Sequence, residues 1–197
     1  FKPGRANYAG YLQEHVAAAR ACGGKVAVSV ISRELPDSVD FLQAAAAAGA
    51  DFVSLCAYSV MPMFTSVGLG VELCRRGNAA RLRDWCTAIV KGVSLPFIIK
   101  MGLDEEQETL AAIEVMKECG VSLFHVAVDE ASRPAGLAAV KTLAATCPFL
   151  IVGGGIRDAK AARRVLEAGA GAVAIAGAAV KDPGVCGRIQ RQLRGEQ

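Results

Sequence analysis

The chain has 197 residues, of which 53% are hydrophobic, and a formal net charge of +3. This length suits one domain with a sizeable core, and the charge is too small to indicate nucleic acid as a partner. No apolar run reaches the ~18 residues of a membrane span and no secretion signal is seen, so we expect a cytoplasmic protein that does not bind membranes. The seven cysteines are odd in number and form no Cys-x-x-Cys pair, which indicates free thiols and argues against a metal site.

Strand-like and helix-like segments alternate along the chain with a short period. A helical pattern over 8–21 stops at Gly23-Gly24 and is followed by the β-branched run KVAVSVI at 25–31. The longest irregular segment, YSVMPMFTSVGLG, covers 58–70. The predicted strands are 25–31, 51–57, 95–101, 123–128, 149–152 and 172–176. The predicted helices are 8–21, 38–48, 71–91 with a break near Gly77, 105–119, 133–145, 158–168 and 183–193.

Six strands alternating with helices predict consecutive βα units and an all-parallel sheet, in the α/β class. An open doubly wound sheet and a TIM (β/α)8 barrel both fit this order, and the glycine-rich turns after the last two strands favour the barrel. Counting back from these turns leaves the first two barrel strands missing. Three explanations are open: the sequence is a fragment, another chain or a second copy completes the barrel, or the sheet is open. We favour a fragment and expect one barrel domain over 1–197, incomplete at its N-terminal end.

Glycines follow both of the last two predicted strands. The first turn carries Gly153, Gly154 and Gly155, and the second carries Ala176 and Gly177. A strand-to-helix turn without Cβ atoms lets an anion approach unpaired backbone N–H groups, and the helix dipole adds positive potential. Glycines also serve tight turns that bind nothing. Because neighbouring strands carry the two turns, we expect them to hold one phosphate between them.

Several stretches of the sequence resemble known barrel families. The segment GGGIRDAKAARRVLEAGAGAVAIAGAAVKDP is similar to the phosphate-binding end of many barrels, including the histidine-biosynthesis cyclase and flavin-dependent enzymes. The stretches GGKVAVSVIS, AAAAGADFVSLCAYSVMP and LPFIIKMGLDEEQETLAAIEVMKECGVSLFHVAV follow in the order found in the FMN barrel superfamily. That superfamily contains dihydroorotate dehydrogenases and tRNA-dihydrouridine synthases.

The resemblance implies an FMN cofactor. Its phosphate would lie on the two glycine turns, and Lys100, near the end of its strand, would contact the flavin. Independently of the family, a lysine after Phe97-Ile98-Ile99 is costly to bury without an anionic partner. At the carboxyl end of a barrel strand, Lys100 could stabilise negative charge in the site. The alternative is a lysine that extends from the strand end into solvent.

The catalytic positions of this superfamily are not all matched. Cys56 stands where the superfamily has an asparagine, and Ser59 is the nearest candidate for its catalytic cysteine or serine. The superfamily histidine falls on Ala127, while His125 lies two residues earlier on the same strand face. We expect His125 to be a core histidine, and Asp129, at the strand end, to be the better placed acid–base group. The predicted catalytic residues are therefore Lys100, Asp129 and Ser59.

Three functions compete at this stage. The first is an FMN-dependent oxidoreductase that exchanges hydride with a C=C bond of a small, pyrimidine-like ring. The second is a flavin-free isomerase, lyase or synthase that binds a phosphorylated small molecule through the two turns. The third is a barrel relative without catalytic activity. In the first two the partner is a small-molecule substrate, and transfer RNA is disfavoured because the synthases carry a further RNA-binding domain after the barrel.

Overall fold

The computed structural model describes residues 4–21 and 23–196. The chain packs as two compact units. Unit 1 comprises Phe1–Met101 and Ala111–Ser122, and unit 2 comprises Gly102–Leu110 and Leu123–Gln197. The prediction of one domain over 1–197 stays a prediction, and each unit is described by itself below.

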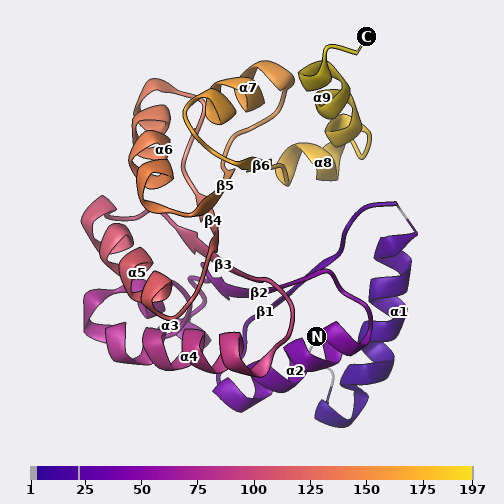
Figure 1. Cartoon of the computed structure of the whole chain (residues 1–197), viewed down its shortest axis with the longest axis vertical. Coiled ribbons are helices and arrows are strands. Elements are labelled where there is room, and N and C mark those ends of the chain that lie inside the picture. The colour runs from indigo at the N-terminus through magenta and orange to yellow at the C-terminus, as the bar shows by residue number, and fades with distance from the viewer. Residues whose placement is uncertain (1–3, 22, 197) are drawn as a thin grey trace. The chain divides into compact units, whose positions relative to one another are not determined.

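The described residues form six parallel strands, and each is followed by helical structure (Figure 1). They are β1 (Ala27–Val30), β2 (Phe52–Ala57), β3 (Phe97–Gly102), β4 (Leu123–Ala127), β5 (Phe149–Gly153) and β6 (Ala172–Ala174). Their order in the sheet is their order in the chain. This arrangement is the repeated βα unit of the TIM-barrel type, so the predicted fold class with six parallel strands is confirmed.

The helices alternate with these strands. The α-helices are α1 (Tyr8–Arg20), α2 (Leu35–Ala47), α3 (Pro62–Thr65), α4 (Ala79–Gly92), α5 (Glu106–Glu118), α6 (Pro134–Thr146), α7 (Ala159–Glu167), α8 (Gly177–Lys181) and α9 (Val185–Arg194). Three short 3-10 helices are η1 (Arg5–Asn7), η2 (Gly70–Cys74) and η3 (Arg76–Asn78). No helix in these described ranges combines the length and the apolar character needed to cross a bilayer.

The predicted helical segment over 71–91 is interrupted close to the expected break near Gly77, and the part before the break is 3-10 and not α-helical. Two 3-10 turns, η2 and η3, occupy 70–78, and the α-helix begins only at Ala79. The reason is local: Arg75 is extended, with φ −77° and ψ 146°, between the two turns. The predicted strand over 172–176 ends at Ala174, because the backbone turns at Ala176 into α8, a short helix that the sequence reading did not predict.

Unit 1 has its core on the helix-facing side of the sheet. Val53, Leu55 and Ala57 of β2 are at most 2% exposed, and α2 packs against β1 and β2. Cys56 points to the opposite side and is half-buried. The alternation follows from the two-residue period of a strand, which sends successive side chains to opposite faces.

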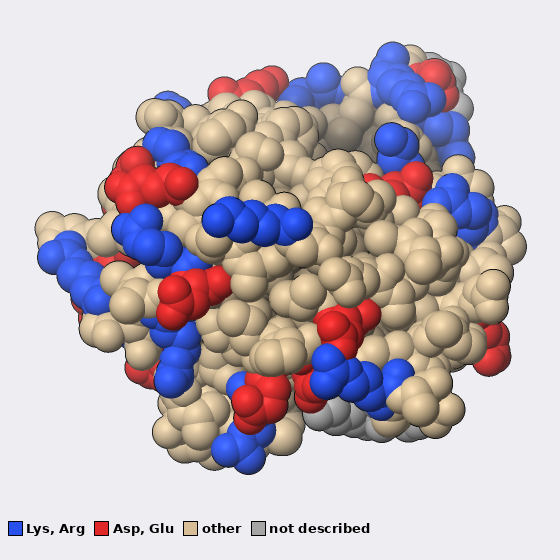
Figure 2. All heavy atoms as spheres, turned by 60° about the horizontal axis from the view of Figure 1, so that its bottom comes forward, with Lys and Arg blue, Asp and Glu red and all other residues tan. Residues whose placement is uncertain are grey.

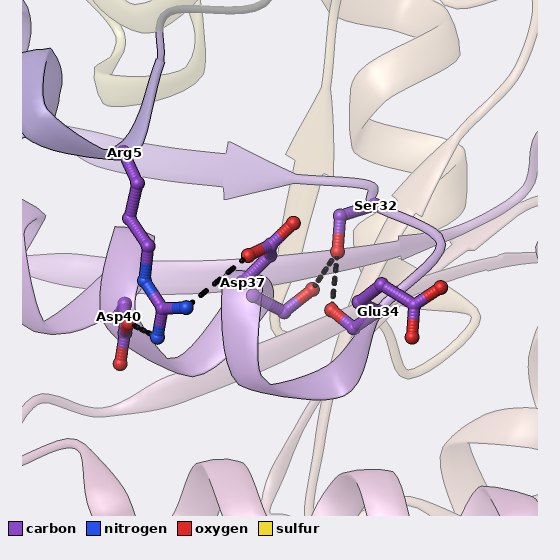
Figure 3. A network of polar contacts seen from close by, with 6 residues as sticks. Arg5, Ser32, Glu34, Asp37 and Asp40 are labelled. Atoms are coloured by element: carbon purple, nitrogen blue, oxygen red, sulfur yellow. Dashed lines mark hydrogen bonds and ion pairs between the residues drawn. The ribbon is translucent and has the colours of Figure 1, made fainter.

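The first described helix of unit 1, η1, forms ion pairs with α2. Arg5, in η1, forms ion pairs with Asp37 at 3.8 Å and with Asp40 (Figure 3). Both carboxylates lie in the first half of α2, where negative charge is also favoured by the helix dipole. These ion pairs lie where η1 packs against α2.

A buried hydroxyl pair connects the end of β1 to α2 (Figure 3). The Ser32 hydroxyl donates to the carbonyl of Glu34 at 2.7 Å and lies 2.8 Å from the Ser38 hydroxyl, which is fully buried. Because Ser32 has one hydroxyl proton, Ser38 is the donor between the two. The pair satisfies polar groups where the chain passes from strand to helix.

Unit 2 repeats this arrangement. Phe124, Val126, Leu150 and Val152 of β4 and β5 are at most 2% exposed on the helix-facing side. α6 packs against β5, and α7 packs against β6 and α9. On the other face, His125 pairs in register with Ile151, and both are half-buried. The strands are thus buried more deeply on one face than on the other.

Charged side chains of both signs are interspersed over most of the face drawn in Figure 2. Ion pairs among the described residues include Arg83 with Glu118 at 2.7 Å and Arg188 with Asp182. The described cysteines are free thiols. Cys22 lies outside the described residues.

Candidate functional site

The predicted site residues fall into two sets. Asp129 and both glycine turns belong to unit 2, whereas Lys100 and Ser59 belong to unit 1. Within unit 2, β5 and β6 pair in parallel, so the turns that follow them leave the same edge of the sheet. The structure therefore places the two predicted glycine turns next to each other.

The first turn leads from β5 into α7. Gly154 and Gly155 have φ of +122° and +65°, a region that other residues rarely adopt. Among the described residues, the N–H groups of Gly155, Ile156 and Arg157 donate no hydrogen bond to a backbone carbonyl. Asp158 then caps α7, its Oδ1 accepting from the N–H of Ala161 at 2.7 Å. The turn thus presents backbone donors at the start of a capped helix.

Position 154 requires glycine because the neighbouring backbone leaves no room for a side chain. A Cβ atom at Gly154 would overlap the carbonyl oxygen of Val128, which follows β4. The two segments are joined by hydrogen bonds, from Val128 N–H to the Gly153 carbonyl at 2.8 Å and from Ala131 N–H to the Gly154 carbonyl at 3.2 Å. Gly154 therefore serves the packing of backbone on backbone, a role that its place in a glycine run did not reveal.

The second turn leads from β6 into α8 and is open. Gly177 is exposed, its φ is not positive, and a Cβ atom there would meet nothing within 4 Å. Neither backbone conformation nor packing in the described chain explains a glycine here. The first N–H groups of α8 lack partners within that helix, as at any helix start.

The acid–base candidates of unit 2 come from β4. Asp129 is exposed two residues beyond the strand end. His125 lies on the sheet face opposite the core, and its Nε2 is 3.1 Å from the position of a Cβ atom at Gly153. The imidazole thus reaches toward Gly153, which is nearer the carboxyl end of β5 than Ile151, its partner in register. His125 is half-buried and not fully enclosed in the core.

Glu130, which sequence reasoning did not select, lies against the first turn. Its carboxylate is 3.3 Å from Arg133 Nε and 3.9 Å from Arg157 Nη2. A Cβ atom at Gly155 would lie 3.3 Å from Glu130 Cδ and Oε1. No sequence pattern signals this contact, because it depends on how the β4–α6 loop folds over the β5–α7 turn.

Unit 1 holds the other predicted residues. Lys100 is half-buried beside Cys56 of β2, and its Nζ lies 5.9 Å from the ring centroid of Tyr58, within reach of a cation–π interaction. No carboxylate of the described chain forms an ion pair with it. Ser59 Oγ accepts a hydrogen bond from the Met61 N–H at 3.3 Å.

The fold and the two turns define a class: a parallel βα protein of the TIM-barrel type, with a candidate anion site at the carboxyl ends of its last two strands. Comparison of the sequence with family models then gives the family. The model of the histidine biosynthesis protein family matches residues 86–197, more than half of the chain, and the chain belongs to this family. The matched region contains both glycine turns. No curated protein matches the sequence.

Solved structures agree on the fold. DHODH from Eimeria tenella, in complex with ferulenol, matches with a TM-score of 0.68 and 15% identity, over 96% of this chain and 62% of that one. Dihydrodipicolinate synthase from Aquifex aeolicus matches with a TM-score of 0.61 and 15% identity, over 99% of this chain and 60% of that one. The chain thus spans about three fifths of the length of these proteins. With the family match, they confirm the TIM-barrel part of the predicted resemblance, and membership of the FMN-binding superfamily stays a prediction.

Proposed function

We propose that this protein is a flavin-free barrel enzyme, an isomerase, lyase or synthase, that acts on a phosphorylated small molecule. One observation carries the proposal: unbonded backbone N–H groups at residues 155–157 lie beside a second turn whose Gly177 has open space around it. Such donors at helix starts suit a phosphate. The family match over both turns supports the same region.

In this proposal the phosphate group only binds the substrate to the protein. Side chains on β4 and directly after it transfer the protons of the reaction. Binding a part of the substrate that does not react fixes the reacting part in place. Asp129 and His125 are the groups of unit 2 that could move a proton, Asp129 from the exposed strand end and His125 from the open face of the sheet. Lys100 and Ser59 remain further candidates from unit 1.

An FMN-dependent oxidoreductase is the second candidate, and Lys100 is the observation that favours it. Lys100 is half-buried and has no ion-pair partner among the described residues, so an anionic ligand would stabilise its charge. The donors of the first turn and the space at Gly177 also fit the phosphate of FMN. When bound, FMN would supply hydride transfer, and the turns of unit 2 would hold its phosphate. The likeness to DHODH is consistent with this candidate.

Gly177 offers a clean test of the phosphate site. Gly177→Asp adds a negative charge in open space, and Gly177→Asn adds a side chain of the same size without the charge. We expect inorganic phosphate and sugar phosphates to raise the melting temperature of the wild type and of the Asn variant, but not of the Asp variant. Equal shifts in the Asp and Asn variants would place the phosphate elsewhere.

Titration with FMN separates the two candidates. An FMN enzyme would bind the cofactor and perturb its visible absorbance, and the Gly177→Asp variant would lose this effect. A protein that binds sugar phosphates, leaves the FMN spectrum unchanged and is not stabilised by FMN supports the flavin-free enzyme.

A further inference from the structure

The backbone of Glu130 is unusual. Its φ of +43° makes it the one residue other than glycine with a positive φ in 4–21 and 23–196. A residue with a side chain is strained in this region, and such a conformation persists only where its surroundings impose it. The bond from Ala131 N–H to the Gly154 carbonyl, 3.2 Å long, holds the loop in place next to Glu130.

This conformation places the Glu130 carboxylate against the first glycine turn. Oε1 and Cδ lie 3.3 Å from the position that a Cβ atom would take on Gly155. The N–H groups of residues 155–157 are the donors that the proposed phosphate would use. The side chain of Glu130 thus lies beside the place where the ligand anion would bind.

Two arginines are held at the same place by this carboxylate. Arg133 Nε is 3.3 Å and Arg157 Nη2 is 3.9 Å from its oxygens. The side chains of Glu130, Arg133 and Arg157 are 42%, 73% and 74% exposed. Ion pairs as exposed as these contribute little to stability, so a ligand could take the arginines from Glu130 at small cost.

We propose that Glu130 is a specificity-determining residue that weakens the binding of phosphate at the first glycine turn. Its charge repels an incoming anion and offsets part of the positive charge of the two arginines, so the turn retains only ligands that gain contacts elsewhere. The proposal rests on the phosphate site proposed above. It adds a selection against small free anions, which would otherwise compete with a larger phosphorylated substrate.

The test is a titration of the 15N-labelled protein with inorganic phosphate, followed through the amide signals of residues 154–157 at constant ionic strength. Glu130→Gln keeps the shape of the side chain and removes its charge. Two unit charges about 4 Å apart in a water-like medium interact by about 1 kcal/mol, or roughly fivefold in affinity. We expect the variant to bind phosphate roughly fivefold more tightly than the wild type.

Two further variants complete the design. Glu130→Asn also removes the charge and tolerates a positive φ, so it replaces Glu130→Gln if that protein does not fold. Glu167→Gln makes the same charge change at the far end of α7 and should leave the affinity unchanged. A Glu130 variant that binds phosphate as weakly as the wild type, or more weakly, would overturn the role of Glu130 and leave the site intact. If no variant binds phosphate at all, both the site and the role of Glu130 are wrong.

Discussion

Substitution of Gly154 by alanine should destabilise the protein strongly, although it adds a single methyl group. The φ of +122° costs a residue with a Cβ atom about 1–3 kcal/mol. The methyl group would also overlap the Val128 carbonyl oxygen, so the β4–α6 loop must move. That movement strains the two hydrogen bonds between the loop and the turn, each worth about 1 kcal/mol. The expected loss in the free energy of unfolding is about 3–5 kcal/mol.

Urea unfolding followed by circular dichroism measures this loss. With a slope of about 2 kcal/mol per molar urea, the midpoint should fall by about 2 M. Gly177→Ala is the matched control, because that methyl group meets nothing within 4 Å and its φ is not positive. We expect the control to be neutral or stabilised by about 0.4–1 kcal/mol. Equal midpoints for the two alanine variants would refute the steric argument.

Three further predictions concern single side chains. Asp158→Ala removes the cap of α7 and should cost about 1 kcal/mol in urea unfolding, whereas Asp158→Asn should retain most of the stability. The pKa of Asp51 lies below its usual 3.8, chiefly because its carboxylate accepts a hydrogen bond from the Val26 N–H. The ionised Asp51 carboxylate stabilises the folded protein above the pKa that it has in the unfolded chain. This stabilisation is lost as the pH falls through the lower pKa of the folded protein. The urea midpoint should therefore fall less below pH 4 in Asp51→Asn than in the wild type. Burial raises the pKa of the Cys86 thiol, so iodoacetamide at pH 8 should modify the exposed Cys186 and spare Cys86 until the protein is unfolded, as peptide mass spectrometry would show.

The strands were predictable because their signal is local. Runs such as KVAVSVI and LPFIIKM consist mostly of β-branched and apolar residues, as buried parallel strands do. The segment 71–91 shows where local reasoning fails. Its apolar spacing fits a helix, but the extended backbone at Arg75 divides it, and α4 begins only at Ala79.

The positions of the two glycine turns were predictable, and their local structure only in part. The two turns follow their strands as expected, yet the sequence gives no sign that Gly154 and Gly177 differ in purpose. The difference depends on Val128, which lies 26 residues before Gly154 and meets it only through the pairing of β4 with β5. Glu130 was not predicted for the same reason: its contact with Gly155 joins two loops.

The lack of room for a Cβ atom at position 154 has a consequence for protein engineering. The loop after β4 and the turn after β5 pack backbone against backbone. A loop from another barrel can therefore replace one of them only if it also fits the other. A transplanted β4–α6 loop would have to keep N–H donors where Val128 and Ala131 have them, and a β5–α7 turn beside the native loop would have to keep glycine at position 154. When barrel segments are recombined, the β4–α6 loop and the β5–α7 turn should therefore be taken from the same parent protein.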